Sequence, residues 1–265
     1  TTNAFTGAIT LTTNDSSGTD ANVTIDGGTT ALDIAASTVD GDLTLTSGNA
    51  SGITDSGTLT IGGNLLATTD ANSGVVNLGT LAVDGTVALA TNGTGAATVV
   101  NDAGLAFAAS TVGGTLSATA TTGDITDSGT QTITGAATYI TAATGSNIIL
   151  DDASNAYAAQ VTFKADTGGG EAFGNLTFVD TGGIKLDANA DAAGDLFIDG
   201  SADGAVGGNL TLTSVTGNVT QGVALAVTGA TTVTTSADDA TITLSNTSNA
   251  FTGAITLTTN DSSGT

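Results

Sequence analysis

The chain of 265 residues contains no proline, cysteine, methionine, tryptophan or histidine. Without cysteine and histidine it cannot build a disulfide framework, a thiol nucleophile, an imidazole base or an ordinary zinc site. Basic residues are nearly absent as well, since there is no arginine and the two lysines are Lys164 and Lys185. A chain with so few cations cannot displace counterions from phosphate, which excludes nucleic acid as a partner.

Large side chains are also scarce. The aromatic residues are seven Phe and two Tyr, so a wide globular core is hard to build. Helices are not expected, because glycine and β-branched residues are scattered throughout and good helix formers are rare. No run of about eighteen apolar residues occurs, so we expect no membrane-spanning helix. Because residue 1 is not a natural start, we expect an internal segment of a longer chain.

Acidic residues dominate the charge. Asp and Glu together number 25, which gives a formal net charge of −23 at pH 7. Glu171 is the one glutamate, so the acidity is carried by aspartate, a residue typical of turns. This balance predicts high solubility and an affinity for cations.

A glycine, one small or polar residue and then an alternating strand recur along the chain. In "GDLTLTS" the side chains of Leu43 and Leu45 point to one face and Thr44 and Thr46 to the other, because a strand has a period of two. Many copies are about 21 to 24 residues apart, which indicates a repeat architecture. The phrase begins at Gly7, Gly41, Gly63, Gly85, Gly114, Gly135, Gly174, Gly194, Gly208 and Gly229.

This period predicts an all-β fold, a right-handed parallel β-helix (β-solenoid) of roughly 20–24 residues per coil. Equivalent strands would lie about 4.8 Å apart and stack small apolar side chains in a narrow interior. Gly, Asn and Asp at the corners would supply unusual backbone angles. The lack of proline fits, since every stacked strand must donate its N–H. A β-sandwich would need larger core residues, and a propeller carries aromatic signatures.

The chain begins and ends with the same phrase. "NAFTGAITLTTNDSSGT" occupies residues 3–19 and 249–265, at an offset of 246 residues. Between the copies, "GITDSGTLTIGGNL" from Gly52 recurs in diverged form as "DITDSGTQTITGAA" from Asp124 and "NVTQGVALAVTGAT" from Asn218. We therefore expect one continuous solenoid over residues 1–265. It would contain one tandem unit of three diverged sub-units, residues 3–248, and the start of the next unit, residues 249–265.

The wording of these repeats resembles a known family. "SNAFTGAITLTT" and "GNLTLTSVTGNVTQGVALAVTGATTVTT" resemble the tandem β-strand repeats of giant bacterial surface adhesins of the filamentous-haemagglutinin type. The resemblance covers nearly the whole chain and is weakest around residues 158–203. It implies a secreted β-helical fibre with adhesion or matrix functions, often exported through an outer-membrane partner. The segment lacks the amino-terminal secretion module of that family.

The main alternative is a β-helical carbohydrate-binding or polysaccharide-cleaving domain. Cleavage would require clustered carboxylates beside a cation, and the two lysines stand alone in the sequence. Neighbouring carboxylates such as Asp238 and Asp239 would point to opposite faces in an extended strand. We therefore expect no enzymatic activity. A groove with at least two carboxylates beside Lys164 or Lys185 would favour the alternative.

Calcium is the one cofactor that the sequence suggests. "DANAD" places Asp187, Asn189 and Asp191 at alternating positions, and "DGSADG" offers Asp199 and Asp203. Oxygen ligands at this spacing suit calcium, but neither segment has the Glu that ends an EF-hand loop. The same residues are also typical of solvated corners.

Together these features predict a structural role. We expect a repeat unit of a long extracellular fibre or adhesin stalk at a bacterial cell surface, mediating cell-surface, biofilm or cell–cell contact. Its partners would be further copies of the same repeat. Lateral self-association and contacts with surface glycans or matrix are further candidates.

Overall fold

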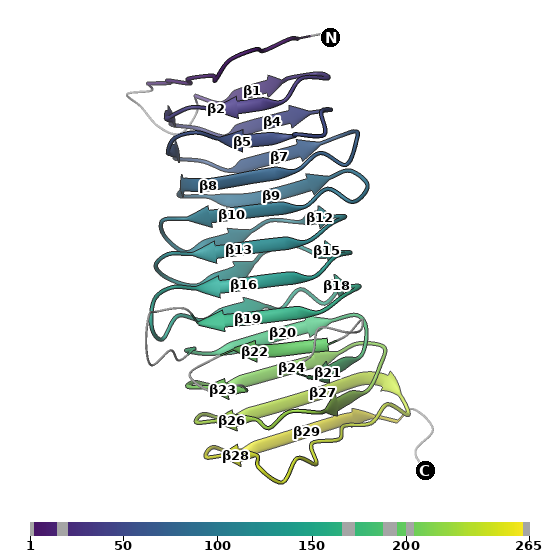
Figure 1. The fold of residues 1–265 in the computed structure, drawn as a ribbon. Helices are drawn as coiled ribbons and strands as arrows, with labels where there is room; N and C mark the ends of the chain where they lie inside the picture. Colours follow the sequence, from purple (N-terminus) through teal and green to yellow (C-terminus); the bar gives the residue numbers. More distant parts are fainter. Residues whose placement is uncertain (1–2, 15–20, 166–172, 188–194, 200–203, 262–265) are drawn as a thin grey trace.

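The computed structural model of the chain describes residues 3–14, 21–165, 173–187, 195–199 and 204–261. Regular structure in these ranges is β throughout, and the strands pair in parallel, coil upon coil (Figure 1). The predicted β-solenoid is thereby confirmed. Leu43 pairs with Leu65 and Leu65 with Val87, so a coil takes 22 residues in this part of the stack. None of the described residues forms a helix suited to crossing a membrane.

Two walls run along the whole stack, and each is a continuous parallel sheet. The first wall contains β1 (Val23–Asp26), β4 (Leu43–Ser47), β7 (Leu65–Thr69), β9 (Thr86–Thr91), β11 (Leu105–Phe107), β14 (Ile125–Asp127), β17 (Ile148–Leu150), β20 (Leu176–Asp180), β24 (Leu210–Ser214), β27 (Thr231–Asp238) and β29 (Ile255–Asn260). The second wall contains β2 (Leu32–Ile34), β5 (Ile53–Asp55), β8 (Val76–Val83), β10 (Ala97–Asn101), β13 (Leu116–Ala120), β16 (Ala137–Thr141), β19 (Val161–Ala165), β22 (Asp195–Asp199), β21 (Ile184–Leu186) and β25 (Val219–Gln221).

A third wall of short strands is interrupted twice. Its strands are β3 (Ser37–Val39) and β6 (Leu59–Ile61), then β12 (Ser110–Val112), β15 (Gln131–Ile133) and β18 (Ala156–Tyr157), and finally β23 (Ala205–Val206), β26 (Ala226–Val227) and β28 (Ala250–Phe251). The strands β3 and β6 join the sheet of the second wall, whereas β12, β15 and β18 join that of the first wall. The last three strands form a sheet of their own.

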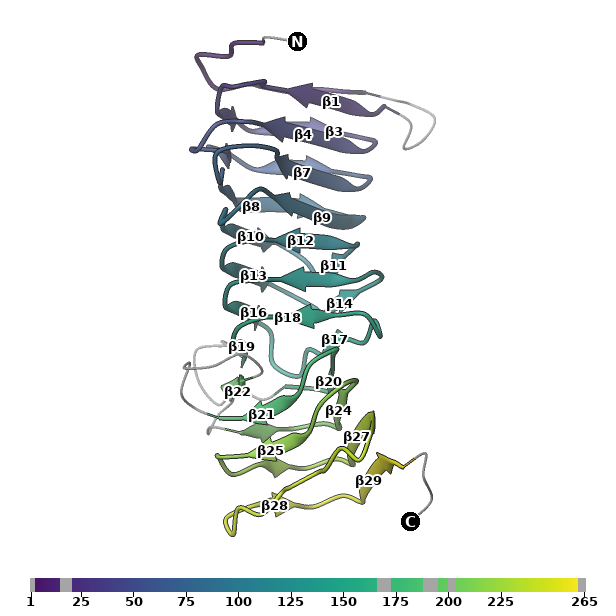
Figure 2. The ribbon, with the colours of Figure 1, turned by 90° about the vertical axis from the view of Figure 1, so that its right-hand side faces the viewer.

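The third wall changes sides at each interruption. In the early coils the chain passes from the second wall through the third to the first, as in β5, β6 and β7. In the middle coils it passes from the first wall through the third to the second, as in β14, β15 and β16. The last coils return to the early order. Figures 1 and 2 show β12, β15 and β18 along one edge of the stack, and Figure 1 shows β23, β26 and β28 along the opposite edge.

Inward side chains of the walls form one hydrophobic core along the stack. Most coils contribute Leu, Ile, Val and Ala, as the narrow interior predicted. The middle coils differ, because five of the nine aromatic residues gather there. The rings of Tyr139 and Phe163 are fully buried, with centroids 5.9 Å apart. The other rings of this aromatic stack are those of Phe107, Tyr157 and Phe178.

The glycines that open the repeated phrase have a different role from the predicted one. In the described chain, glycines with positive φ occur at other positions, such as Gly52 and Gly145. The N–H of Gly208 instead donates to the carbonyl oxygen of Gly174, one coil earlier, at 2.8 Å. A Cβ at Gly208 would lie 2.3 Å from that oxygen. Glycine is therefore required at this corner because successive coils approach too closely for a side chain.

Asn and Asp beside these glycines also act differently from the prediction. The backbone N–H of Asn64 donates to Oδ1 of Asp42 at 2.7 Å, and that of Thr86 donates to Oδ1 of Asn64 at 2.8 Å. The N–H of Asn175 likewise donates to Oδ1 of Asn147 at 2.6 Å. These side chains connect coil to coil and satisfy backbone donors at the corner. They do not carry positive φ angles in the described residues.

Candidate functional site

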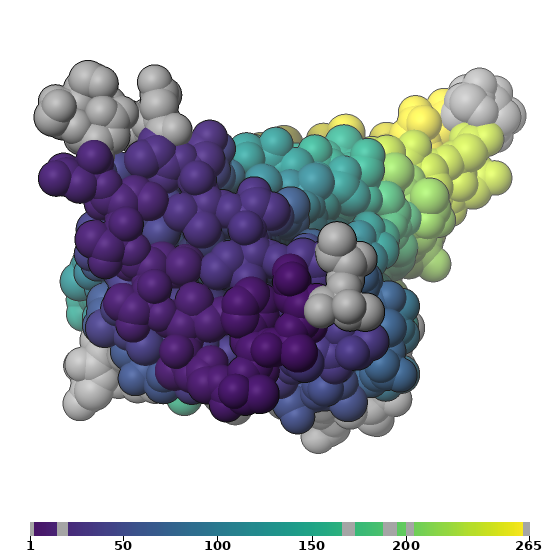
Figure 3. Space-filling view, turned by 90° about the horizontal axis from the view of Figure 1, so that it is seen from above, coloured from purple at the N-terminus to yellow at the C-terminus, as the bar shows by residue number. Residues whose placement is uncertain are grey.

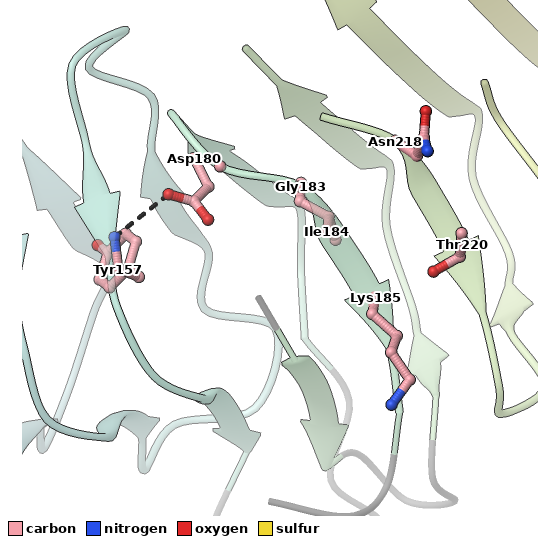
Figure 4. Close-up of a pocket in the computed structure, with 8 residues that line it drawn as sticks. Tyr157, Asp180, Gly183, Ile184, Lys185, Asn218 and Thr220 are labelled. Carbon is pink, nitrogen blue, oxygen red and sulfur yellow. Dashed lines mark hydrogen bonds between the residues drawn. The ribbon is translucent and has the colours of Figure 1, made fainter. Parts of the chain in front are cut away.

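A groove of about 380 Å³ opens where the third wall changes sides for the second time (Figure 4). Here Leu176 pairs with Leu210, so this coil takes 34 residues and contains both β21 and β22. Among the described strands β18 pairs with β15 alone, which leaves the wall below it open. The groove is lined by Tyr157, Asp180, Gly182, Gly183, Ile184, Lys185, Asn218 and Thr220.

Asp180 closes part of the open edge. It is the last residue of β20, it is buried, and its Oδ1 accepts a hydrogen bond from the backbone N–H of Tyr157 at 3.2 Å. The next residue, Thr181, donates its N–H to the carbonyl oxygen of Asn155 at 2.7 Å. The carboxylate thus takes the place that a backbone carbonyl of a further strand would occupy below β18.

Lys185 supplies the positive charge of the groove. Its Nζ lies 2.6 Å from Oδ2 of Asp187 and 3.4 Å from Oδ1 of the buried Asp195. The hydrogen bond with Asp187 raises the pKa of Lys185. In Figure 4 the Lys185 side chain points away from Asp180, and Thr220 lies on the neighbouring strand β25. The groove therefore offers separated charges of both signs and neutral polar groups, which suits a polar ligand held by hydrogen bonds.

The calcium residues predicted from the sequence are only partly placed. Asn189, Asp191 and Asp203 lie outside the described residues. Asp187 follows β21 and forms an ion pair with Lys185. Asp199 ends β22 and lies in register beside Lys164 of β19. Both described carboxylates therefore have a lysine on a neighbouring or the same strand.

A different acidic group is brought together by the stacking of coils. Carboxylate oxygens of Asp238, Asp239 and Asp261 lie within 4.8 Å of one another, and all three residues are exposed. The expectation that Asp238 and Asp239 point to opposite faces is wrong, because β27 ends at Asp238 and Asp239 has φ of 59°. Sequence reasoning missed the third member, since Asp261 comes from the next coil.

Two aspartates in the middle coils make stability depend on pH. Burial raises the pKa of Asp180 and of Asp127 above the ordinary value of 3.8, against the lowering effect of their hydrogen bonds. In the window just above 3.8 the folded chain then holds more protons than the unfolded chain. We expect the free energy of unfolding to fall as pH rises through this window.

Urea titrations at a series of pH values would measure this slope. Asp180→Asn and Asp127→Asn keep the shape of the side chain and are expected to flatten the slope. Asp84→Asn removes the same charge from an exposed position and controls for net charge. Stability that rises with pH through this window in the unsubstituted chain would contradict the assignment.

The groove itself was not predicted from the sequence. Its polar residues come from three strands that are distant in the chain, namely β18, β21 and β25, together with the end of β20. The available signal was the long interval between Gly174 and Gly208 in an otherwise shorter period. That interval indicated an irregular coil, but it could not show which side chains would line the opening.

A family described as repeats of unknown function (DUF5649) matches residues 20–78, 94–164 and 173–258. Neither a curated protein nor a solved structure shows significant similarity to the chain. Each matched range contains one copy of the diverged phrase, starting its short strand at Ile53, Ile125 or Val219. The ranges also contain the third-wall strands β3 and β6, then β12, β15 and β18, then β23, β26 and β28. Because the matches cover most of its length, the chain belongs to this family of repeats.

Proposed function

We propose that the chain is a structural repeat unit of a long extracellular fibre or adhesin stalk, which spans distance at a bacterial cell surface. The observation that carries this proposal is the identical phrase at residues 3–19 and 249–265, placed at the two ends of one stack of coils. A solenoid grows by adding coils, because each coil contacts only its neighbours. A duplicated unit can therefore lengthen the stack without a new core.

The chemistry of the surface supports the same role. With a net charge of −23 and alternating Thr, Ser and Asn on the outer faces, the stack would stay soluble and resist collapse onto itself. The absence of cysteine is compatible with the outside of a bacterium, and the resemblance to giant adhesins favours that location. The fibre would act by its length and its exposed polar faces and would have no enzymatic role.

The geometry sets the length that each unit would contribute. The first wall contains eleven strands among the described residues, and neighbouring parallel strands lie about 4.8 Å apart. A unit of 246 residues would therefore extend a fibre by roughly 50 Å.

Negative-stain images of chains with one, two and four units would test the proposal. We expect thin filaments whose length grows by roughly 50 Å per added unit at constant width. Particles that become wider without becoming longer would contradict it. Strings of separate compact particles joined by variable angles would also contradict it.

Carbohydrate binding is a second candidate, and the groove at Asp180 and Lys185 is the observation that favours it. The groove has a cation, one lining carboxylate and neutral polar groups, as a binding site for a sugar would. Two lining carboxylates beside the lysine, which cleavage would require, are not found among its described residues. We therefore rank glycan binding below the structural role and polysaccharide cleavage below both.

A further inference from the structure

The first side change of the third wall takes place on one strand, β9. One edge of β9 pairs with the preceding first-wall strand, where Leu65 is in register with Val87. The opposite edge is divided between two strands of the next coil. Val87 pairs there with Phe107 of β11, and Ala90 pairs with Thr111 of β12. The first partner is 20 residues ahead and the second 21, so one extra residue is inserted where the third wall branches from the first wall.

The two copies of the seventeen-residue phrase show the two halves of this arrangement separately. In the amino-terminal copy, the edge that faces the next coil pairs Ile9 with Ile34 of β2 and Thr12 with Thr38 of β3. The first partner is 25 residues ahead and the second 26, so one residue is again gained between the two contacts. The N–H of Ile9 donates to the oxygen of Asp33 at 2.8 Å.

In the carboxy-terminal copy the other edge is used. The strand β29 pairs with the preceding first-wall strand, so that Thr231 lies beside Ile255 and Val233 beside Leu257. This is the relation that β9 has to β7. Since Ile255 corresponds to Ile9 and Leu257 to Leu11, one sequence forms the two pairings on opposite edges, and both pairings are compatible with a single strand.

Burial shows that each copy lacks what the other has. Ile255 and Leu257 are 48% and 51% exposed, the largest exposures among the large apolar residues described. Their counterparts Ile9 and Leu11 are partly buried and pack against the core. Figure 3 shows the amino-terminal residues lying across the upper end of the stack, whereas β29 lies at the lower end with no described strand beyond it.

We propose that β29 is the joint between consecutive units, and that its open edge pairs with β2 and β3 of a following copy of the same unit. This rests on the proposed function, because it takes the fibre to continue past Thr265 with a second copy. Direct stacking of the next β1 on β29 is excluded by chain length. The eight residues that would separate these strands are too few, because a parallel crossover needs about a dozen or more.

The joint has a consequence for the whole fibre. The third wall changes sides twice within a unit, and the joint adds a third change at the boundary. Since this number is odd, the first and second walls exchange roles from one unit to the next. Equivalent faces, including the groove at Asp180 and Lys185, then lie on opposite sides of the fibre in successive units.

A two-unit chain tests the joint, because the sequence has no cysteine that could interfere. The chain continues after Thr265 with a second copy that begins at residue 20. Thr258→Cys in the first copy corresponds to Thr12, so it should form a disulfide with Thr38→Cys in the second copy. The pair Ala90→Cys and Thr111→Cys has the same relation inside one unit and serves as the positive control. Thr258→Cys with Thr60→Cys of the second copy, one coil further on, is the negative control.

We expect the joint pair to cross-link under mild oxidation at least as completely as the internal control, with a mobility shift that a reductant reverses. Hydrogen exchange provides a second readout without substitutions, since amides of β29 should become protected in the two-unit chain relative to the single unit. An elongated particle with neither cross-link nor protection would overturn the joint and leave the fibre in place. Two compact particles at variable angles would overturn both proposals.

Discussion

Replacing Phe163 with alanine is expected to lower the free energy of unfolding by about 3–5 kcal/mol, the range for truncating a fully buried aromatic side chain. Phe163 is 0% exposed and lies at the centre of the aromatic stack, with its ring centroid 5.9 Å from that of Tyr139 and 5.3 Å from that of Phe178. The neighbours belong to different coils and are held by the hydrogen bonds of three strands. They cannot move inward to fill the cavity, so its cost remains.

Urea unfolding followed by circular dichroism would measure this loss. Phe5→Ala is the matched control, because Phe5 is 37% exposed and lies outside the aromatic stack, and a change of about 0.5 kcal/mol or less is expected there. Phe163→Leu refills most of the space and should recover part of the loss. A cost below about 1 kcal/mol for Phe163→Ala would mean that the coils repack, which contradicts the rigid stack described above.

Replacing Gly52 with alanine is the second substitution with a large expected effect. The φ angle of Gly52 is +64°, and a Cβ there would lie 1.8 Å from the carbonyl oxygen of Val75 in the next coil. The left-handed conformation costs about 1–2 kcal/mol for a residue with a side chain. Displacing a neighbouring backbone adds about 1–3 kcal/mol. We expect a total loss of about 2–5 kcal/mol in the free energy of unfolding, measured by the same urea titration.

Three further glycines separate the two contributions. Gly145 has φ of +78° with no atom within 4 Å of its Cβ position, so Gly145→Ala reports the backbone angle alone. Gly85 has no positive φ, but its Cβ would lie 2.4 Å from the oxygen of Gly63, so Gly85→Ala reports close approach alone. Gly79 has neither constraint and should tolerate alanine with little change. A Gly85→Ala variant as stable as Gly79→Ala would refute the role given to the corner glycines.

These glycines also show where sequence reasoning stops. The regular recurrence of Gly85, Gly135 and Gly208 in the sequence correctly located a corner in each coil. The reason for glycine there was wrong, because a sequence shows which residue is present and not what faces its Cα. Only the stacked coils reveal that the preceding glycine's carbonyl oxygen occupies the space where a side chain would be.

The groove and the acidic group illustrate the same limit. Asp180 and Lys185 are close in sequence, but Tyr157 and Thr220 join them through the irregular coil of 34 residues. Asp261 meets Asp238 and Asp239 because one coil lies directly on the next. Such contacts depend on the length and path of each coil, and small differences in loop length change them without disturbing the alternating pattern of the strands.

The sequence by itself determined the class of fold and the division of the unit. Alternation of apolar and polar residues, recurring every coil, leaves a parallel stack as the arrangement that buries one face of every strand and pairs every backbone group. The three diverged phrases likewise marked the three ranges that match the repeat family.

The tertiary structure alone decided which wall each phrase joins. Three copies of one phrase start at Ile53 in the second wall, at Ile125 in the first wall and at Val219 in the second wall again. The physical reason is that the two walls present the same narrow apolar interior and the same backbone edges. A phrase fits either wall equally well, and its place is set by one residue gained at a strand such as β9, where the preceding coil hands its edge to two strands of the next.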